Sequence, residues 1–205
     1  MNNPLISCLC PTKNSIKTVK KAIKCFEEQV YPNKELILVV DEDGIHVNDI
    51  KKFVSGNIKL FYAPKNTTLG DIRNISVNKA NGEYVAQWDD DNIHHRNRLL
   101  MQYMAIKNSK KHACFLKRVL INNTVNGDKG VSFENSGVES TILALKNSLP
   151  VYPSINIGED VSIRKYFIDT KNCVILNEPQ LYVYNIHGKN TCKYNNLLKM
   201  IEVTI

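Results

Sequence analysis

Apolar and polar positions follow two alternating patterns along the first half of the chain. Continuous apolar runs predict buried strands at residues 5–10, 35–40, 58–63 and 83–88. Between these runs, apolar side chains recur every three or four positions, which predicts helices at residues 15–29, 49–54, 70–80 and 97–108. Strands that are apolar throughout and alternate with helices are typical of a parallel α/β sheet.

The second half of the chain is less regular. Strands are predicted at residues 112–121, 138–146, 173–176 and 180–186, with one helix at residues 159–167. Residues 122–137 are polar and rich in glycine and asparagine, which indicates a loop or a loose hairpin. The tail from His187 is polar and then weakly helical. Since no repeat and no low-complexity linker divides the sequence, we expect one α/β domain over residues 1–205.

The composition is that of a globular domain with a basic surface. Of the 205 residues, 43% are hydrophobic and 23% are charged, so disorder is not expected. The net charge of +7 is compatible with three kinds of binding partner, namely nucleic acid, an anionic membrane surface or a phosphorylated small molecule. Nucleic acid is not expected as a partner, because the sequence carries neither an aromatic and basic RNA motif nor zinc-finger spacing.

The cysteines and the start of the chain bear on its location. The chain opens with Met1-Asn2-Asn3-Pro4, without the long apolar region of a signal peptide. Its apolar stretches are shorter than the ~20 residues that span a bilayer. The six cysteines lie in apolar segments and lack CxxC spacing, so we expect them to be reduced and buried rather than zinc ligands. We therefore expect a cytoplasmic protein, with peripheral association at the membrane surface left open.

Acidic residues gather where predicted strands end. Asp41 and Asp43 follow the second strand, while Asp89, Asp90 and Asp91 follow the fourth. Ligands of open parallel sheets bind at the carboxyl ends of the strands. Three consecutive carboxylates repel one another unless a cation compensates, which favours Mg²⁺ or Mn²⁺ at the second cluster. The first cluster, taken alone, is better explained as a solvated turn.

Five pieces of the sequence resemble glycosyltransferase family 2, in the order that this family shows. They are the opening run at residues 4–14, the run at 39–44, the pair at 69–74 and 80–85, the run Gln87-Trp88-Asp89-Asp90-Asp91-Asn92 continued by His95 and Arg98-Leu99, and Gly158-Glu159-Asp160. The resemblance extends over nearly the whole chain. It implies the GT-A fold, in which a Rossmann-like, mostly parallel central sheet is flanked by helices, with a small mixed region at the acceptor side.

The same resemblance implies a function and a set of site residues. The implied reaction is an inverting, metal-dependent transfer of a sugar from a UDP-type nucleotide-sugar to a hydroxyl group of a glycan, protein or lipid. Residues 1–95, approximately, would bind the nucleotide-sugar, and residues 96–205 would bind the acceptor. The implied nucleotide-sugar ligands are Pro11, Thr12, Asn14, Asp41, Asp43, Arg73, Asp89 and Asp90. Asp91 would hold Mn²⁺ or Mg²⁺, and Asp160 would be the catalytic base.

Several positions have two interpretations. His187 lies in a segment that resembles a late element of some family members, where it would approach the metal; otherwise it is a polar surface residue. Glu139 and Glu159 are expected on the acceptor side, although Glu139 also fits a turn. His94 and His95 are interpreted as part of the loop that leads into the next helix. Asn92 departs from the family, because many relatives carry a further acid there.

Two other functions fit parts of the pattern. A nucleotide-binding α/β module without transfer activity would need no distant base, so Asp160 counts against it. A nucleotidyltransferase also needs acidic metal ligands, but it normally carries a glycine-rich phosphate loop after the first strand. Here that loop reads Pro11-Thr12-Lys13-Asn14 and has no glycine.

Overall fold

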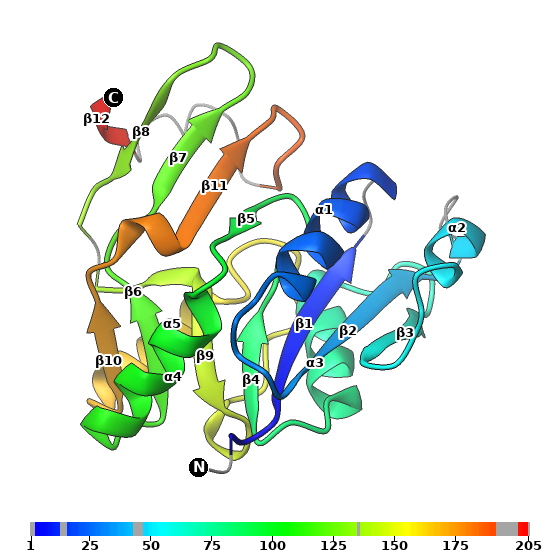
Figure 1. Ribbon diagram of the computed structural model, residues 1–205, viewed down its shortest axis with the longest axis horizontal. Coiled ribbons are helices and arrows are strands. Elements are labelled where there is room, and N and C mark those ends of the chain that lie inside the picture. The colour runs from blue at the N-terminus through cyan, green and yellow to red at the C-terminus, as the bar shows by residue number, and fades with distance from the viewer. Residues whose placement is uncertain (1–2, 13–15, 43–46, 135, 192–200, 205) are drawn as a thin grey trace.

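A seven-stranded sheet forms the centre of the protein (Figure 1). The computed structural model describes residues 3–12, 16–42, 47–134, 136–191 and 201–204. The strands of this sheet are β1 (Ile6–Thr12), β2 (Lys34–Asp41), β3 (Ile58–Ala63), β4 (Tyr84–Gln87), β6 (Ala113–Leu116), β9 (Val138–Leu145) and β10 (Cys173–Leu176). They lie in the order β10-β6-β9-β4-β1-β2-β3, and all neighbours are parallel except that β9 runs antiparallel to β4 and β6. The mostly parallel α/β sheet predicted from the apolar runs is confirmed.

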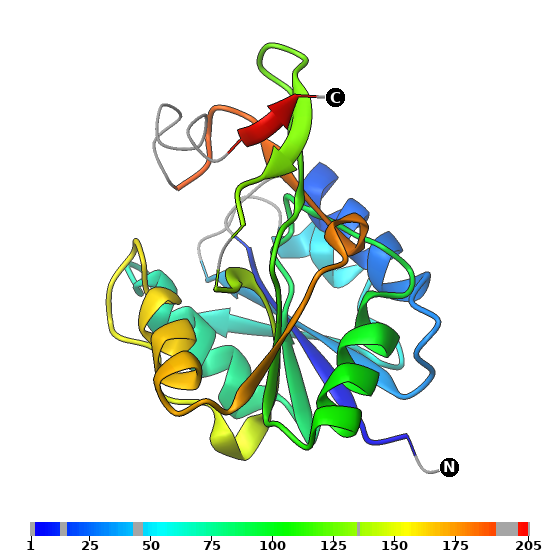
Figure 2. The same cartoon turned by 90° about the vertical axis from the view of Figure 1, so that its left-hand side faces the viewer.

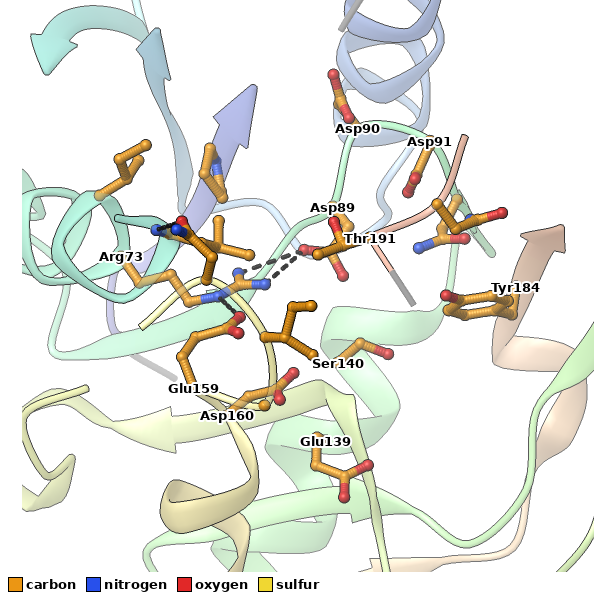
Figure 3. Close-up of a pocket in the computed structure, with 18 of the residues that line it drawn as sticks. Arg73, Asp89, Asp90, Asp91, Glu139, Ser140, Glu159, Asp160, Tyr184 and Thr191 are labelled. Atoms are coloured by element: carbon orange, nitrogen blue, oxygen red, sulfur yellow. Dashed lines mark hydrogen bonds and ion pairs between the residues drawn. The ribbon is translucent and has the colours of Figure 1, made fainter. Parts of the chain in front are cut away.

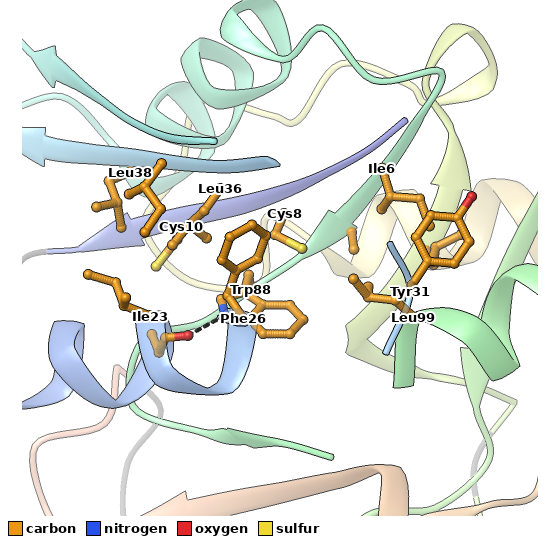
Figure 4. Close-up of a cluster of buried hydrophobic side chains, with 14 of the residues drawn as sticks. Ile6, Cys8, Cys10, Ile23, Phe26, Tyr31, Leu36, Leu38, Trp88 and Leu99 are labelled. Carbon is orange, nitrogen blue, oxygen red and sulfur yellow. Dashed lines mark hydrogen bonds between the residues drawn. The ribbon is translucent and has the colours of Figure 1, made fainter. Parts of the chain in front are cut away.

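Helices cover both faces of this sheet (Figure 2). The helices are α1 (Ile16–Glu27), α2 (Val47–Lys51), α3 (Leu69–Lys79), α4 (Arg98–Ser109) and α5 (Val161–Asp169), with 3₁₀ turns at η1 (Lys146–Ser148) and η2 (Pro179–Leu181). Successive side chains of β1 point to opposite faces of the sheet, so they contribute in turn to the two apolar clusters that lie on these faces. Cys8 and Cys10 face α1 and its Phe26 (Figure 4). Leu9 packs with Ile72 of α3 on the opposite face.

A second, smaller sheet stands above the central one in Figure 1. Its strands are β5 (Ile93–His94), β7 (Leu120–Asn123), β8 (Lys129–Ser132), β11 (Tyr182–Ile186) and β12 (Ile201–Thr204), in the order β12-β8-β7-β11-β5. Only β11 and β7 are parallel, so this is the small mixed region that the resemblance implied.

Three sequence predictions differ from the structure. The single strand predicted at residues 112–121 is two strands, β6 and β7, which belong to different sheets. The segment predicted to lead into a helix contains β5, which pairs with β11. Residues 201–204, predicted to be weakly helical, form β12 because they pair with β8. In each case the partner is a strand distant in sequence, which local periodicity does not contain. The hairpin alternative for residues 122–137 is confirmed by the pairing of β7 with β8.

The cysteines in the described part of the chain lie in or near the core. Cys8, Cys10 and Cys114 are buried, as predicted, while Cys25 and Cys173 are partly buried. Among the helices of the described residues, none combines the length and apolar character that a bilayer crossing requires.

Candidate active site

A cavity of about 540 Å³ lies at the carboxyl ends of β1 and β4. Its walls also include residues of α3, β9, the segment before α5, and β11 with the residues that follow it. The predicted site residues that line it are Pro11, Thr12, Arg73, Asp89, Asp90, Asp91, Glu139, Glu159 and Asp160. Figure 3 shows Asp90 and Asp91 on one side and Asp160 and Glu139 on the opposite side.

The other predicted site residues have different positions. Asn14 and Asp43 lie outside the described residues. Asp41 is the last residue of β2, which pairs with β1 so that Thr12 lies opposite the preceding Val40. His187 directly follows β11.

Asp90 is anchored to the first strand and helix. The residue is 3% exposed, and the hydroxyl groups of Thr12 and Thr18 donate to Oδ2 over 2.5 and 3.1 Å. These bonds join the loop after β4 to β1 and α1. These bonds therefore fix the position of the loop with the three aspartates relative to β1 and α1.

Replacing Thr12 by valine is expected to lower the free energy of unfolding by about 1–3 kcal/mol, because the buried Asp90 carboxylate loses a hydroxyl donor and keeps its charge. Urea denaturation measures this change. Thr170→Val is the matched control, since it removes an exposed hydroxyl that bonds a backbone carbonyl of α5. Equal losses in both variants would contradict an anchoring role for Thr12.

Asp91 and His187 meet across the cavity edge. The Asp91 Oδ2 and His187 Nε2 atoms are 3.1 Å apart, and the Asn185 side chain donates to the Asp91 carbonyl oxygen over 2.6 Å. Burial and the neighbouring Asp89 charge raise the pKa of Asp91. The structure thus brings together the two residues that the sequence analysis named as metal ligands.

Arg73 connects the two acidic sides of the cavity. Its Nε donates to Glu159 Oε1 over 2.8 Å, and its Nη2 donates to Asp89 Oδ1 over 3.2 Å. The side chain is almost fully buried and lies beside the Tyr152 ring. Arg73 therefore holds the segment before α5 against the end of β4.

Asp160 and Glu139 supply carboxyl groups opposite Asp91. Asp160 is the N-cap residue of α5, but its side chain makes no capping hydrogen bond. Burial raises the pKa of Asp160, although the nearby Arg73 charge partly offsets this effect. Burial likewise raises the pKa of Glu139, whose Oε1 is 2.8 Å from Arg164 Nε. Carboxyl groups with raised pKa values exchange protons more readily near neutral pH.

The sequence analysis missed a buried support beneath the aspartates. Arg98 is fully buried and its Nη1 contacts His94 Nδ1 at 2.5 Å, while His94 Nε2 contacts the Asp89 carbonyl oxygen at 3.1 Å. Because a guanidinium group only donates, His94 Nδ1 accepts and Nε2 carries the proton. Burial and the Arg98 charge lower the pKa of His94 well below its ordinary value, in agreement with a neutral ring.

A local signal for this support exists in the sequence. Arg98 and Gln102 are four residues apart on the same helix face as Leu99, Tyr103 and Ile106, which are apolar and buried. A polar pair on an otherwise apolar face indicates a buried hydrogen-bond network.

Asn92 couples the aspartate loop to the second sheet. Its side-chain nitrogen donates to the Tyr182 hydroxyl over 2.8 Å, and its side-chain oxygen accepts from the Asn185 backbone over 2.9 Å. The asparagine side chain supplies both a donor and an acceptor here, whereas an ionised carboxylate would only accept.

Comparison with known proteins decides the family. The family described as "Glycosyl transferase family 2" matches residues 7–167. The chain belongs to glycosyltransferase family 2. This family 2 chain is 30% identical over 130 residues to an Escherichia coli protein, UDP-Glc:alpha-D-GlcNAc-diphosphoundecaprenol beta-1,3-glucosyltransferase WfgD, with 62% of this chain and 51% of WfgD covered. It is 36% identical over 98 residues to an uncharacterised glycosyltransferase of Haemophilus influenzae, covering 45% of this chain and 38% of that protein.

Solved structures of glycosyltransferases share the fold. TarS of S. aureus, residues 1–349 in complex with UDP-GlcNAc, superposes with a TM-score of 0.71 at 16% identity, over 91% of this chain and 60% of that 1–349 chain. The mannosyltransferase PcManGT of Pyrobaculum calidifontis, in complex with GDP-Man and Mn²⁺, gives 0.70 at 15% identity, over 93% of this chain and 59% of PcManGT. The GT-A fold implied by the sequence is confirmed. This family 2 chain spans 51% of the length of WfgD and 38% of the length of the Haemophilus influenzae protein.

Proposed function

We propose that this family 2 chain transfers a sugar from a UDP-type nucleotide-sugar to a hydroxyl group of an acceptor, with inversion at the anomeric carbon. The observation that carries the proposal is the convergence of two opposed carboxylate groups on one cavity (Figure 3). Asp89, Asp90 and Asp91 extend from β4 on one side, and Asp160 precedes α5 on the other. An in-line displacement needs charge compensation behind the leaving group and a base behind the attacking hydroxyl.

The donor side is assigned to the first half of the chain, to about residue 95. Pro11, Thr12 and the aspartate loop form its described wall, and the acceptor side is assigned to the later residues. The choice of a uridine nucleotide is supported by WfgD, whose name includes UDP-Glc, and by TarS, which was solved with UDP-GlcNAc. PcManGT was solved with GDP-Man, so a guanosine donor is the comparison to make in the assay.

A divalent cation fits the donor side. Asp91 and His187 offer a carboxylate oxygen and an imidazole nitrogen 3.1 Å apart, a donor set that suits Mn²⁺. Within the described ranges, no group of three or more acidic, histidine or cysteine side chains could enclose an ion. Mn²⁺ and Mg²⁺ are often held by one or two protein ligands together with substrate phosphates, which matches a two-residue site. When bound, the ion would neutralise the charge that develops on the leaving diphosphate.

The remaining steps belong to side chains of this chain. Asp160 accepts the proton of the attacking hydroxyl group, for which a raised pKa is suited. Arg73 keeps the segment of Asp160 at a constant distance from Asp89, because it binds Glu159 and Asp89 together. The acceptor hydroxyl enters beside Glu139 and Ser140, which line the same wall.

A donor screen tests the proposal. UDP-glucose, UDP-N-acetylglucosamine, UDP-galactose and GDP-mannose are incubated with the full chain and Mn²⁺, and release of the nucleoside diphosphate is measured. We expect slow release from at least one UDP-sugar and its loss on chelation. Absence of release and of calorimetric binding for every donor, with either metal, would contradict the proposed function.

Asp41 at the end of β2 is proposed to accept a hydrogen bond from the uracil ring nitrogen. Asp41→Ala is therefore expected to weaken UDP binding by about 1.5–3 kcal/mol, the contribution of one charge-assisted hydrogen bond. Isothermal titration calorimetry with UDP measures this change. Asp49→Ala, which removes an exposed carboxylate of α2, is the control and should bind UDP normally. Unchanged UDP affinity in Asp41→Ala would exclude this role.

A further inference from the structure

Arg98 of α4 is a fully buried cation whose hydrogen-bond partners in the described part of the chain are uncharged. Its guanidinium group donates to Gln102 Oε1 over 3.0 Å, to His94 Nδ1 over 2.5 Å and to the Gln87 carbonyl oxygen over 3.0 Å. A charge in the core costs free energy that such partners return only in part. Stability alone therefore does not account for an arginine at this position.

The partners of Arg98 attach it to three neighbouring strands of the central sheet. Gln87 is the last residue of β4. The Gln102 side chain donates in turn to the carbonyl oxygens of Thr141 in β9 and Cys114 in β6, over 2.8 and 3.3 Å. These strands lie side by side in the order β6-β9-β4. The guanidinium group thus has a fixed position relative to the sheet whose strand ends form the cavity.

His94 connects Arg98 to the loop of the three aspartates. Its Nδ1 accepts from Arg98, and its Nε2 donates to the Asp89 carbonyl oxygen over 3.1 Å. The imidazole ring is stacked on Trp88 at a centroid distance of 3.8 Å, and the Tyr182 ring packs against it at 5.2 Å. Both ring nitrogens are hydrogen-bonded and two aromatic rings contact the imidazole, so His94 is held in one orientation.

The carbonyl group that His94 holds lies at the start of the aspartate loop. Residues 89–92 connect β4 to β5 and belong to neither strand. Asp91 follows two residues after Asp89, and its Oδ2 is 3.1 Å from His187 Nε2. A segment outside a sheet has no ladder of backbone bonds, so its position depends on hydrogen bonds from surrounding groups. The bond from His94 is one of those that set the position of Asp91.

We propose that His94, anchored by Arg98, is a positioning residue for sugar transfer, which holds the aspartate loop so that Asp91 lies at the distance from Asp160 that the reaction needs. This inference rests on the proposed function, which assigns the leaving group to the side of Asp91 and the base to Asp160 on the opposite side (Figure 3). Displacement of a group by ~1 Å can lower a reaction rate by about 10²-fold. Loss of one hydrogen bond changes a binding constant by up to about tenfold.

Two substitutions of His94 test the proposal in the full chain. His94→Phe keeps a ring that can stack on Trp88 and loses both hydrogen bonds. His94→Gln offers an amide oxygen to Arg98 and an amide N–H to the Asp89 carbonyl oxygen, so it can restore them. With Mn²⁺ present, we expect the phenylalanine variant to hydrolyse UDP-sugars about 10²-fold more slowly than wild type. Its UDP affinity should fall by up to about tenfold, and the glutamine variant should recover most of the rate.

Histidine-ring NMR measures the position of the loop without any donor. In a chain labelled at its histidine rings, the His187 signal should shift in His94→Phe and stay at its wild-type position in His94→Gln. Glu35→Gln is the matched control, because it alters another buried charged residue, one that accepts from Ser7 near the start of β1, away from the cavity. It should lower stability in urea and leave both the His187 signal and the hydrolysis rate unchanged.

The outcomes separate positioning from a merely structural role. Equal hydrolysis rates in wild type and His94→Phe would overturn the proposal, as would an unshifted His187 signal in that variant. If His94→Phe does not fold, Arg98→Lys takes its place, because it keeps the charge and loses the planar fork, and it should shift the His187 signal and slow hydrolysis. Absence of hydrolysis and of UDP binding in wild type would contradict the proposed function instead, and the His187 signal would still decide whether His94 holds the loop.

Discussion

Replacing Asp160 by asparagine is expected to lower the rate of sugar transfer by about 10²–10⁴-fold, the usual contribution of a general base. The asparagine keeps the shape of the side chain and removes the oxygen that accepts the proton. UDP affinity is expected to stay within about threefold, less than 1 kcal/mol, because Asp160 lies on the side of the cavity opposite Asp91. Transfer rates, or donor hydrolysis with water as a poor acceptor, measure the first effect, and calorimetry measures the second.

The pH dependence of the rate separates catalysis from stability. Burial raises the pKa of Asp160, so the wild-type rate should fall as the pH drops through a value above the ordinary range of an aspartate. The asparagine variant should lack this acidic limb. A helix-capping role would instead give near-normal turnover and a small loss of thermal stability, an outcome that would remove Asp160 from the mechanism. The absence of a capping hydrogen bond from its side chain counts against that role.

Replacing Asp91 by alanine is expected to abolish the metal dependence of donor binding and to lower turnover on the order of 10³-fold or more. A cation at a leaving diphosphate contributes several kcal/mol, and each 1.36 kcal/mol changes a rate about tenfold. Calorimetry with UDP, with and without Mn²⁺, measures the binding effect. Wild type should bind UDP more tightly with the metal, and chelation should remove the difference.

Two variants act as controls for Asp91. His187→Ala removes the second member of the pair and should weaken the metal effect without eliminating it, since the carboxylate remains. Asp169→Asn removes an exposed carboxylate paired with Lys165 on α5 and should leave both measurements unchanged. If wild type and Asp91→Ala bind UDP with equal affinity and neither affinity changes on chelation, the assignment of Asp91 as a metal ligand is wrong. Circular dichroism of each variant establishes that the fold is retained.

Local patterns predicted most of the central sheet. The predicted strands at residues 58–63 and 173–176 coincide with β3 and β10. Both are mostly apolar runs, with Lys59 the one charged residue, and both are bounded by asparagine or proline; such runs have few other ways to bury their side chains. The helix at residues 15–29 was predicted from its apolar stripe and is observed as α1, which ends two residues earlier, at Glu27; residue 15 lies outside the described residues. Frayed helix ends of this size are usual.

Local patterns failed where the chain changes sheets. Residues 112–121 read as one strand because the apolar run continues on both sides of Lys117 and Arg118. The structure divides them between β6 of the central sheet and β7 of the second sheet. Membership of a sheet depends on the partner strand, and β11, the partner of β7, begins more than sixty residues later. Nothing in the run itself records that partner.

The sequence by itself determined the family and the α/β sheet, because apolar runs and the order of motifs can be read along the chain. It also predicted the acidic residues that line the cavity. Only the tertiary structure decided which side chains meet. Asp91 and His187, 96 residues apart, are brought together by β11 beside the aspartate loop. Arg73 joins Asp89 to Glu159 through contacts between α3, β4 and the segment before α5. Such contacts depend on packing between elements distant in the chain, and a linear pattern does not encode their distances.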